Sequence, residues 1–124
     1  ASRLEGLTRV YKVPVICSEY IKQDIEDNVL DHNIQFVELD VVKVKGKTIG
    51  KKVYWPIPKE ILTEEMTEYI KKFEIGLKLY YDGNWPEANK YFNQCKLELA
   101  DVFRERTSGV CPQEWDGIWT MTTK

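Results

Sequence analysis

The apolar positions of the first thirty residues predict a helix, a short strand and a second helix. Apolar residues recur at steps of three and four over residues 1–12, which predicts a helix with one apolar face. The nearly continuous apolar run of residues 13–17 is typical of a short buried strand. Ser18 stands where a helix N-cap belongs, and apolar residues repeat every four positions over 21–29, which predicts the second helix.

The next segment changes from a helical period to an alternating one. Over residues 35–45 the alternation predicts a strand that carries Val37 and Leu39 on one face and Asp40 on the other. A glycine turn then leads to a second β-prone run at 51–55, so the two runs predict a hairpin. The two prolines that follow are predicted to close this hairpin and to mark a boundary.

The helical period returns in the second half of the chain. An apolar stripe over residues 62–80 predicts a long helix that ends at an Asp-Gly-Asn turn. Pro86 suits the first position of another helix, whose stripe continues to Phe103 and predicts a single helix. Two amphipathic helices joined by a tight glycine turn predict an antiparallel helical hairpin, so the elements together predict an α+β fold.

The last segment, residues 108–124, contains too many apolar residues to stay in solvent. We expect it to pack back on the body of the molecule, with Trp115 and Trp119 as anchors.

Composition narrows the class of protein. The chain has 124 residues, of which 43% are hydrophobic and 31% charged, as in a water-soluble globular protein. A net charge of −2 argues against a nucleic-acid partner, and no apolar run is long enough to span a membrane. Cys17, Cys95 and Cys111 lack the spacing of metal ligands, so they predict free thiols in a cytoplasmic protein without a metal site of its own.

Five lysines gather around the predicted hairpin turn. They could bind an anion, or they could keep a solvated hairpin from pairing edge to edge with another chain. Composition favours the second interpretation. The five are Lys43, Lys45, Lys47, Lys51 and Lys52.

Two stretches resemble the C-terminal part of the class III nucleotidyl cyclase domain. The opening ASRLEGLTRVYKVPVICSE is similar to a family segment that runs through a helix into a strand. The later FVELDVVKVKGK is similar to the family's penultimate strand and its Val-Lys-Gly-Lys turn. The resemblance implies that residues 1–57 form part of a ferredoxin-like cyclase sheet with its helices, and that 58–124 form a separate helical hairpin and tail.

The resemblance assigns roles to two residues. Arg3 matches a catalytic arginine that stabilises negative charge at the reacting phosphates, where paired donors suit phosphoryl oxygens. Lys45 matches a lysine that contacts the terminal phosphates of the substrate as a point charge. The implied reaction is attack of the ribose 3′-hydroxyl of ATP or GTP on its α-phosphate, with release of pyrophosphate.

The family's other functional residues would precede Ala1. They include two aspartates that hold Mg²⁺ or Mn²⁺, the base-selecting residues and a ribose-orienting asparagine. We therefore expect this chain to be a fragment that binds no metal and is inactive alone. Because family sites form between two catalytic domains, the resemblance implies a homodimer or pairing with another cyclase domain.

The second half resembles a single tetratricopeptide-like repeat, with Gly76 and Ala88 small where two helices would cross. One such repeat cannot bury both of its faces, so it should pack on the rest of the chain or on a partner. The alternative function is therefore a helical protein-interaction module without catalysis, which would act through a groove on the helices of residues 66–103.

Overall fold

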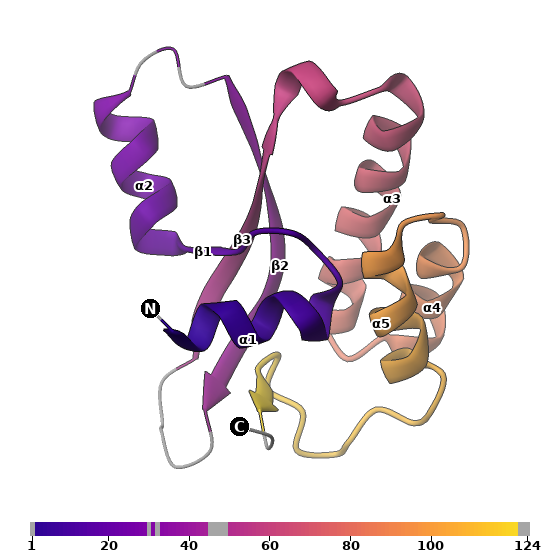
Figure 1. The fold of residues 1–124 in the computed structure, drawn as a ribbon. Coiled ribbons are helices and arrows are strands. Elements are labelled where there is room, and N and C mark those ends of the chain that lie inside the picture. The colour runs from indigo at the N-terminus through magenta and orange to yellow at the C-terminus, as the bar shows by residue number, and fades with distance from the viewer. Residues whose placement is uncertain (1, 30, 32, 45–49, 122–124) are drawn as a thin grey trace.

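The computed structural model describes residues 2–29, 31, 33–44 and 50–121, and these residues form an α+β fold (Figure 1). Helices alternate with strands in the first half, whereas three helices follow one another in the second half. The elements are α1 (Ser2–Tyr11), β1 (Cys17–Ser18), α2 (Glu19–Asn28), β2 (Ile34–Val44), β3 (Lys51–Pro58), the 3-10 turn η1 (Lys59–Ile61), α3 (Glu64–Tyr81), α4 (Trp85–Phe92), α5 (Glu98–Thr107) and β4 (Trp119–Met121).

The strands form one sheet in the order β1-β3-β2-β4. β3 pairs antiparallel with both β1 and β2, which confirms the predicted hairpin. The prediction that the prolines close this hairpin was wrong, because Pro56 and Pro58 lie within β3 opposite Phe36 and Ile34. Prolines are tolerated there because β1 pairs with β3 only at Val53 and Tyr54, which leaves the far end of β3 as an edge among the described residues.

The strand predicted at residues 13–17 is much shorter than expected. Only Cys17 and Ser18 pair with β3. Pro14 has no N–H group to donate to a ladder, and the chain before Cys17 instead buries Val13 and Ile16 in the core. Ser18 caps α2 as predicted, since its Oγ accepts a hydrogen bond from the N–H of Ile21 at 3.2 Å.

A β-bulge in β2 overturns the predicted alternation of its faces. Glu38 pairs with Tyr54 and Asp40 pairs with Val53, so Leu39 is the extra residue. The bulge moves the following residues to the opposite face, and Asp40 becomes fully buried beside Val37 and Leu39 instead of facing away from them.

The helical half differs from the predicted hairpin at one point. α3 begins at its N-cap Thr63, whose side chain accepts from the N–H of Met66, and its chain reverses at Gly83, where φ is +87°. The single helix predicted from Pro86 to Phe103 is instead two helices, α4 and α5. Arg104 stabilises the break between them, because its Nη1 donates to the carbonyl oxygens of Phe92 at 2.6 Å and Cys95 at 2.8 Å.

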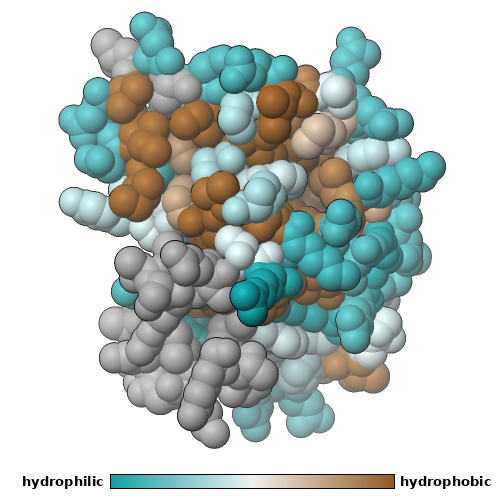
Figure 2. All heavy atoms as spheres, in the orientation of Figure 1, coloured by the Kyte–Doolittle hydropathy of each residue, from teal (hydrophilic) through white to brown (hydrophobic). Residues whose placement is uncertain are grey.

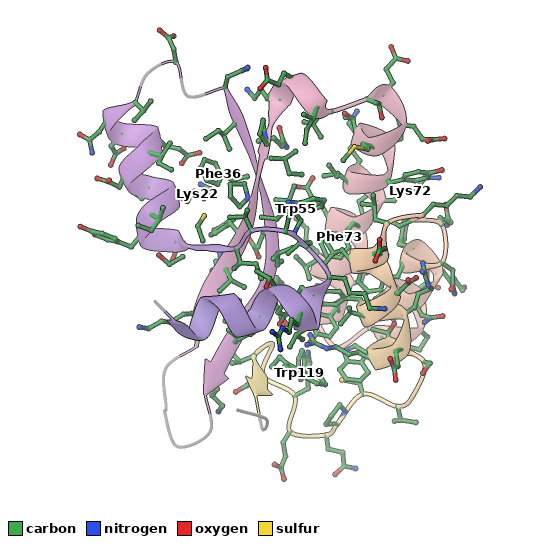
Figure 3. The ribbon with its side chains drawn as sticks, in the orientation of Figure 1. Lys22, Phe36, Trp55, Lys72, Phe73 and Trp119 are labelled. Carbon is green, nitrogen blue, oxygen red and sulfur yellow. The ribbon has the colours of Figure 1, made fainter. Side chains whose placement is uncertain are left out.

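Helices flank both faces of the sheet. Lys22 of α2 lies over the rings of Phe36 and Tyr54 on one face, and Trp55 points toward α3 and Phe73 on the other (Figure 3). One core cluster runs through the described residues and includes side chains from both sides of residue 57. The division of the chain into 1–57 and 58–124 stays a prediction.

The last segment packs on the body, as predicted. β4 pairs parallel with β2, with Trp119 opposite Val42. The Nε1 of Trp115 donates to the carbonyl oxygens of Tyr80 at 2.8 Å and Tyr81 at 3.1 Å, which satisfies the end of α3.

Candidate functional site: a buried ionic cluster

The structure leaves the two predicted site residues untested. The backbone of Arg3 lies in the first turn of α1, but its side chain is outside the described part of the structure. Lys45 follows Val44, the last residue of β2, and lies outside the described residues. Their convergence on one triphosphate therefore stays a prediction.

A different polar cluster occupies the centre of the molecule. We call it the ionic cluster and define it as Tyr11, Asp40, Tyr80, Arg106 and Trp119. These side chains come from α1, β2, α3, α5 and β4. The side chains of Asp40 and Arg106 are 0% and 7% exposed, so their charges are removed from water.

Asp40 accepts a set of hydrogen bonds that satisfies both carboxylate oxygens. Its Oδ2 accepts from the Tyr11 hydroxyl and from Nη1 of Arg106, each at 2.6 Å. Its Oδ1 accepts from the N–H of Val41 at 2.9 Å. Such charge-assisted hydrogen bonds are what a buried carboxylate needs in order to remain ionised.

Arg106 is held by further contacts around its guanidinium. Nη1 also donates to the Tyr80 hydroxyl at 3.2 Å, and Nη2 donates to the Tyr11 hydroxyl at 3.4 Å. The guanidinium carbon Cζ lies 3.8 Å from the centroid of the Trp119 ring. This stacking closes the side of the guanidinium that faces β4 and joins the tail to the sheet.

The cluster changes the acidity of its members. Burial, and then the charge of Asp40, raise the pKa of Tyr11 and of Tyr80 above the usual range of tyrosine. Burial raises the pKa of the Asp40 carboxyl, and Arg106 and the Tyr11 hydrogen bond limit that rise. Both phenols therefore remain neutral donors and acceptors at any physiological pH.

The ionic cluster leaves neither of its charged groups free to bind a solute. The charged groups satisfy one another and are covered by aromatic rings, so the cluster has the geometry of an internal tie between five elements. We assign it a structural role. It carries no role in the proposed chemistry.

The residue pattern gave little sign of this cluster. An aspartate within an apolar strand is the one unusual feature, but its partner Arg106 is distant in the sequence and sits among the other charges of α5. The bulge that turns Asp40 inward has no marker, because Leu39 continues the alternation. Trp119 was predicted as an anchor, although not as a partner of Arg106.

Two further findings concern the described residues alone. They contain no group of three or more His, Cys, Asp or Glu side chains placed to hold a metal ion. They also contain no helix with the length and apolar character needed to cross a bilayer.

Comparison of the chain with protein-family models, with curated proteins and with solved structures finds no match.

Proposed function

We propose that this chain is the C-terminal part of a class III nucleotidyl cyclase, which converts ATP or GTP to a cyclic nucleotide and pyrophosphate. The observation that carries the proposal is the element order of its two cyclase-like stretches. The first stretch covers α1 and β1, and the second covers β2 up to its turn. A helix that runs into a strand, followed later in the chain by another strand, is the order that the resemblance implies.

The pairing of the strands supports the same proposal. β1 and β2 both lie beside β3, so the two resembling stretches belong to one sheet. The end of α1 is tied to the middle of β2 by the hydrogen bond between Tyr11 and Asp40. Arg3 belongs to α1 and Lys45 directly follows β2 in the sequence, so this bond joins the two elements that adjoin the predicted site residues. A specific ferredoxin-like cyclase sheet remains part of the proposal.

Arg3 and Lys45 would divide the work on the substrate. As the 3′-hydroxyl attacks the α-phosphate, Arg3 would stabilise the growing charge on the phosphoryl oxygens. Lys45 would hold the terminal phosphates that leave as pyrophosphate. When bound, Mg²⁺ or Mn²⁺ would supply activation of the hydroxyl, held by aspartates that precede Ala1 in the longer protein. A second cyclase domain would complete the site.

The proposal is tested by comparing this chain with the longer chain encoded by its reading frame. The chain by itself, mixed with ATP or GTP and Mg²⁺ or Mn²⁺, should form no cyclic nucleotide. The longer chain should form it, and Arg3→Ala should lower kcat by roughly 100- to 1000-fold, as removal of one charge-stabilising donor does. Lys45→Ala should raise KM for the nucleotide.

Two matched variants serve as controls. Arg9 is exposed on the same helix as Arg3, and Lys51 is exposed at the other end of the β2–β3 connection. Arg9→Ala and Lys51→Ala should leave turnover unchanged. Turnover by the present chain alone, or a longer chain whose turnover is insensitive to Arg3→Ala, would overturn the proposal.

The alternative, a helical interaction module, is weakly supported. The apolar stripes of α3, α4 and α5 are buried in the core of this chain, as shown by the full burial of Phe73, Phe92 and Phe103. They leave little apolar surface on these helices for a partner, so we rank the alternative second.

A further inference from the structure

The tail segment, which we define as residues 115–121, is fixed by a contact at almost every step. The Nε1 of Trp115 donates to carbonyl oxygens at the end of α3. The Asp116 carboxylate accepts from the N–H of Ile118 at 3.1 Å, and Gly117 between them has a φ of +85°, which favours glycine. These contacts define the course of the backbone as it enters β4.

The tail segment contacts both strands of the hairpin at the same end of the sheet. β4 pairs with Val42–Val44, the last residues of β2 (Figure 1). The side chain of Ile118 lies against Gly50, the residue before β3, because a Cβ added to Gly50 would stand 3.0 Å from two carbon atoms of Ile118. The same Cβ would stand 3.0 Å from Cγ1 of Val41 in β2. The end of the hairpin is therefore held by the tail as well as by its own pairing.

The tail segment also reaches α1, and it does so through Arg106. Polar residues cover the surface over α5 (Figure 2), whereas Arg106 of this helix turns inward and lies against the ring of Trp119, 3.8 Å from its centroid. Nη2 of Arg106 donates to the Tyr11 hydroxyl at 3.4 Å, and that hydroxyl donates to Asp40 at 2.6 Å. Trp119 therefore covers the group of side chains that joins α1 to β2.

Tyr11 anchors α1 at the end of the helix that is far from Arg3. It is the last residue of α1 and is fully buried, whereas residues 7–10 are partly buried or exposed. The helix from Tyr11 back to Arg3 is about 12 Å long, so a tilt of roughly 5° at Tyr11 displaces the backbone of Arg3 by about 1 Å. The contacts of Tyr11 therefore help to set the position of Arg3.

We propose that Trp119 is a positioning residue of the proposed cyclase site, and that the tail segment sets α1 and the end of β2 relative to each other. The inference rests on the proposed function, in which α1 carries Arg3 and the end of β2 adjoins the phosphate-binding lysine. Trp119 touches no substrate, and its effect on the rate passes through Arg106 and Tyr11 to Arg3. Displacement of a catalytic group by about 1 Å costs up to roughly 100-fold in rate.

A double-mutant cycle in the longer chain encoded by the reading frame tests this inference. Trp119→Ala removes the ring that covers Arg106, so kcat for cyclic nucleotide formation should fall by about 10- to 100-fold. When Arg3→Ala is already present, Trp119→Ala should change kcat by less than about threefold, because the group that it positions is gone. Trp119→Phe keeps an aromatic face over the guanidinium and should recover most of the rate.

Gly76→Ala is the matched control for a loss of stability alone. It crowds Phe92 at the crossing of α3 and α4. Any effect of this variant on kcat comes from a smaller folded fraction, so it should be the same factor with and without Arg3→Ala. Hydrogen exchange gives a readout that does not depend on turnover. Trp119→Ala should raise the exchange rate of the amides in the last turn of α1 by at least about tenfold and leave those of α3 unchanged.

The outcomes distinguish this inference from the proposed function. A wild-type longer chain that forms no cyclic nucleotide overturns the proposed function, and the positioning role with it. An active longer chain whose kcat is unchanged by Trp119→Ala overturns the positioning role alone. An equal loss from Trp119→Ala with and without Arg3 means that Trp119 acts only through stability, which also overturns the positioning role.

Discussion

Asp40 and Arg106 show why a charge can sit in the centre of this molecule. Either charge buried alone would destabilise the fold, because the free energy needed to remove an ion from water exceeds the stabilisation from a single poorly aligned contact. Here the carboxylate has three donors, and the guanidinium has three oxygen acceptors with an indole face beside it. These contacts together stabilise the buried ion pair, although two apolar side chains of similar size at these positions would stabilise the fold about equally.

The first prediction follows from that set. Arg106→Met leaves the Asp40 carboxylate buried without its charge partner, so the free energy of unfolding should fall by roughly 3–5 kcal/mol. Asp40→Leu combined with Arg106→Met removes both charges and should recover a large part of this loss. Urea unfolding followed by tryptophan fluorescence measures both variants.

An exposed ion pair provides the matched control. Lys90 and Glu87 lie 2.9 Å apart with both side chains largely in solvent. Lys90→Ala should change stability by less than about 1 kcal/mol. A loss from Arg106→Met no larger than this would show that the cluster contributes little.

The second prediction concerns the crossing of α3 and α4. A Cβ added to Gly76 would stand 2.9 Å from Cε1 of Phe92, whose ring is fully buried. Gly76→Ala should therefore destabilise the protein by roughly 1–3 kcal/mol through overpacking, although alanine is the better helix former. Thermal unfolding measures this loss of stability. Gly109 is the control, because a Cβ added there meets nothing within 4 Å, so Gly109→Ala should leave the stability unchanged.

At the scale of elements, local patterns predicted most of the fold and long-range contacts decided the rest. The period of apolar residues was enough for α1, α2, α3 and the hairpin of β2 and β3, because apolar residues recur at a regular spacing over most of each element. The break between α4 and α5 was missed because it depends on Arg104, whose side chain holds carbonyl groups 12 and 9 residues earlier, which the period of apolar residues does not reveal. The bulge at Leu39 was missed for the same reason, since only the partner strand reveals it.

The candidate site was predicted less well than the fold. Arg3 and Lys45 came from a family resemblance and await a test, whereas the buried cluster was not predicted at all. Periodicity identifies which face of an element is buried, but it does not identify which distant side chain will meet a buried charge. Asp40 and Arg106 illustrate this, because an aspartate within an apolar strand is unusual but nothing in the pattern of α5 marks Arg106 as its partner.

The third prediction compares two helices. α2 buries no residue, whereas α3 buries five, including Phe73 and Tyr80. Elements with few buried contacts open locally at little cost, so the amides of α2 should exchange with deuterium much faster than those of α3 in the native state. Equal protection of the two helices at low concentration would contradict the prediction.

At the scale of the whole molecule, buried phenols couple folding to alkaline pH. Burial, and then Glu38, raise the pKa of Tyr54 to about 12, and burial also raises the pKa of Tyr11 and Tyr80. A tyrosine in the unfolded chain loses its phenol proton at about pH 10. Above that pH the unfolded state binds fewer protons than the folded state, so stability falls as pH rises.

The fourth prediction is the resulting pH profile. The stability that Tyr54 contributes is fully present below about pH 10 and is lost as pH rises toward about 12. The free energy of unfolding, measured in urea at a series of alkaline pH values, should fall across this window. Tyr54→Phe should make the decline shallower, because phenylalanine has no proton to lose. An identical slope in the variant would show that Tyr54 does not contribute.

The parallel pairing of β4 with β2 has a consequence for biosynthesis. The edge of β2 at Val42–Val44 is complete only when residues 119–121 add to it. On the ribosome, this edge is made early but receives its neighbour only after α3, α4 and α5 have been synthesised. Until then the unpaired edge of β2 can pair with a strand of another chain. The lysines near this edge would oppose such pairing, and so aggregation, during translation.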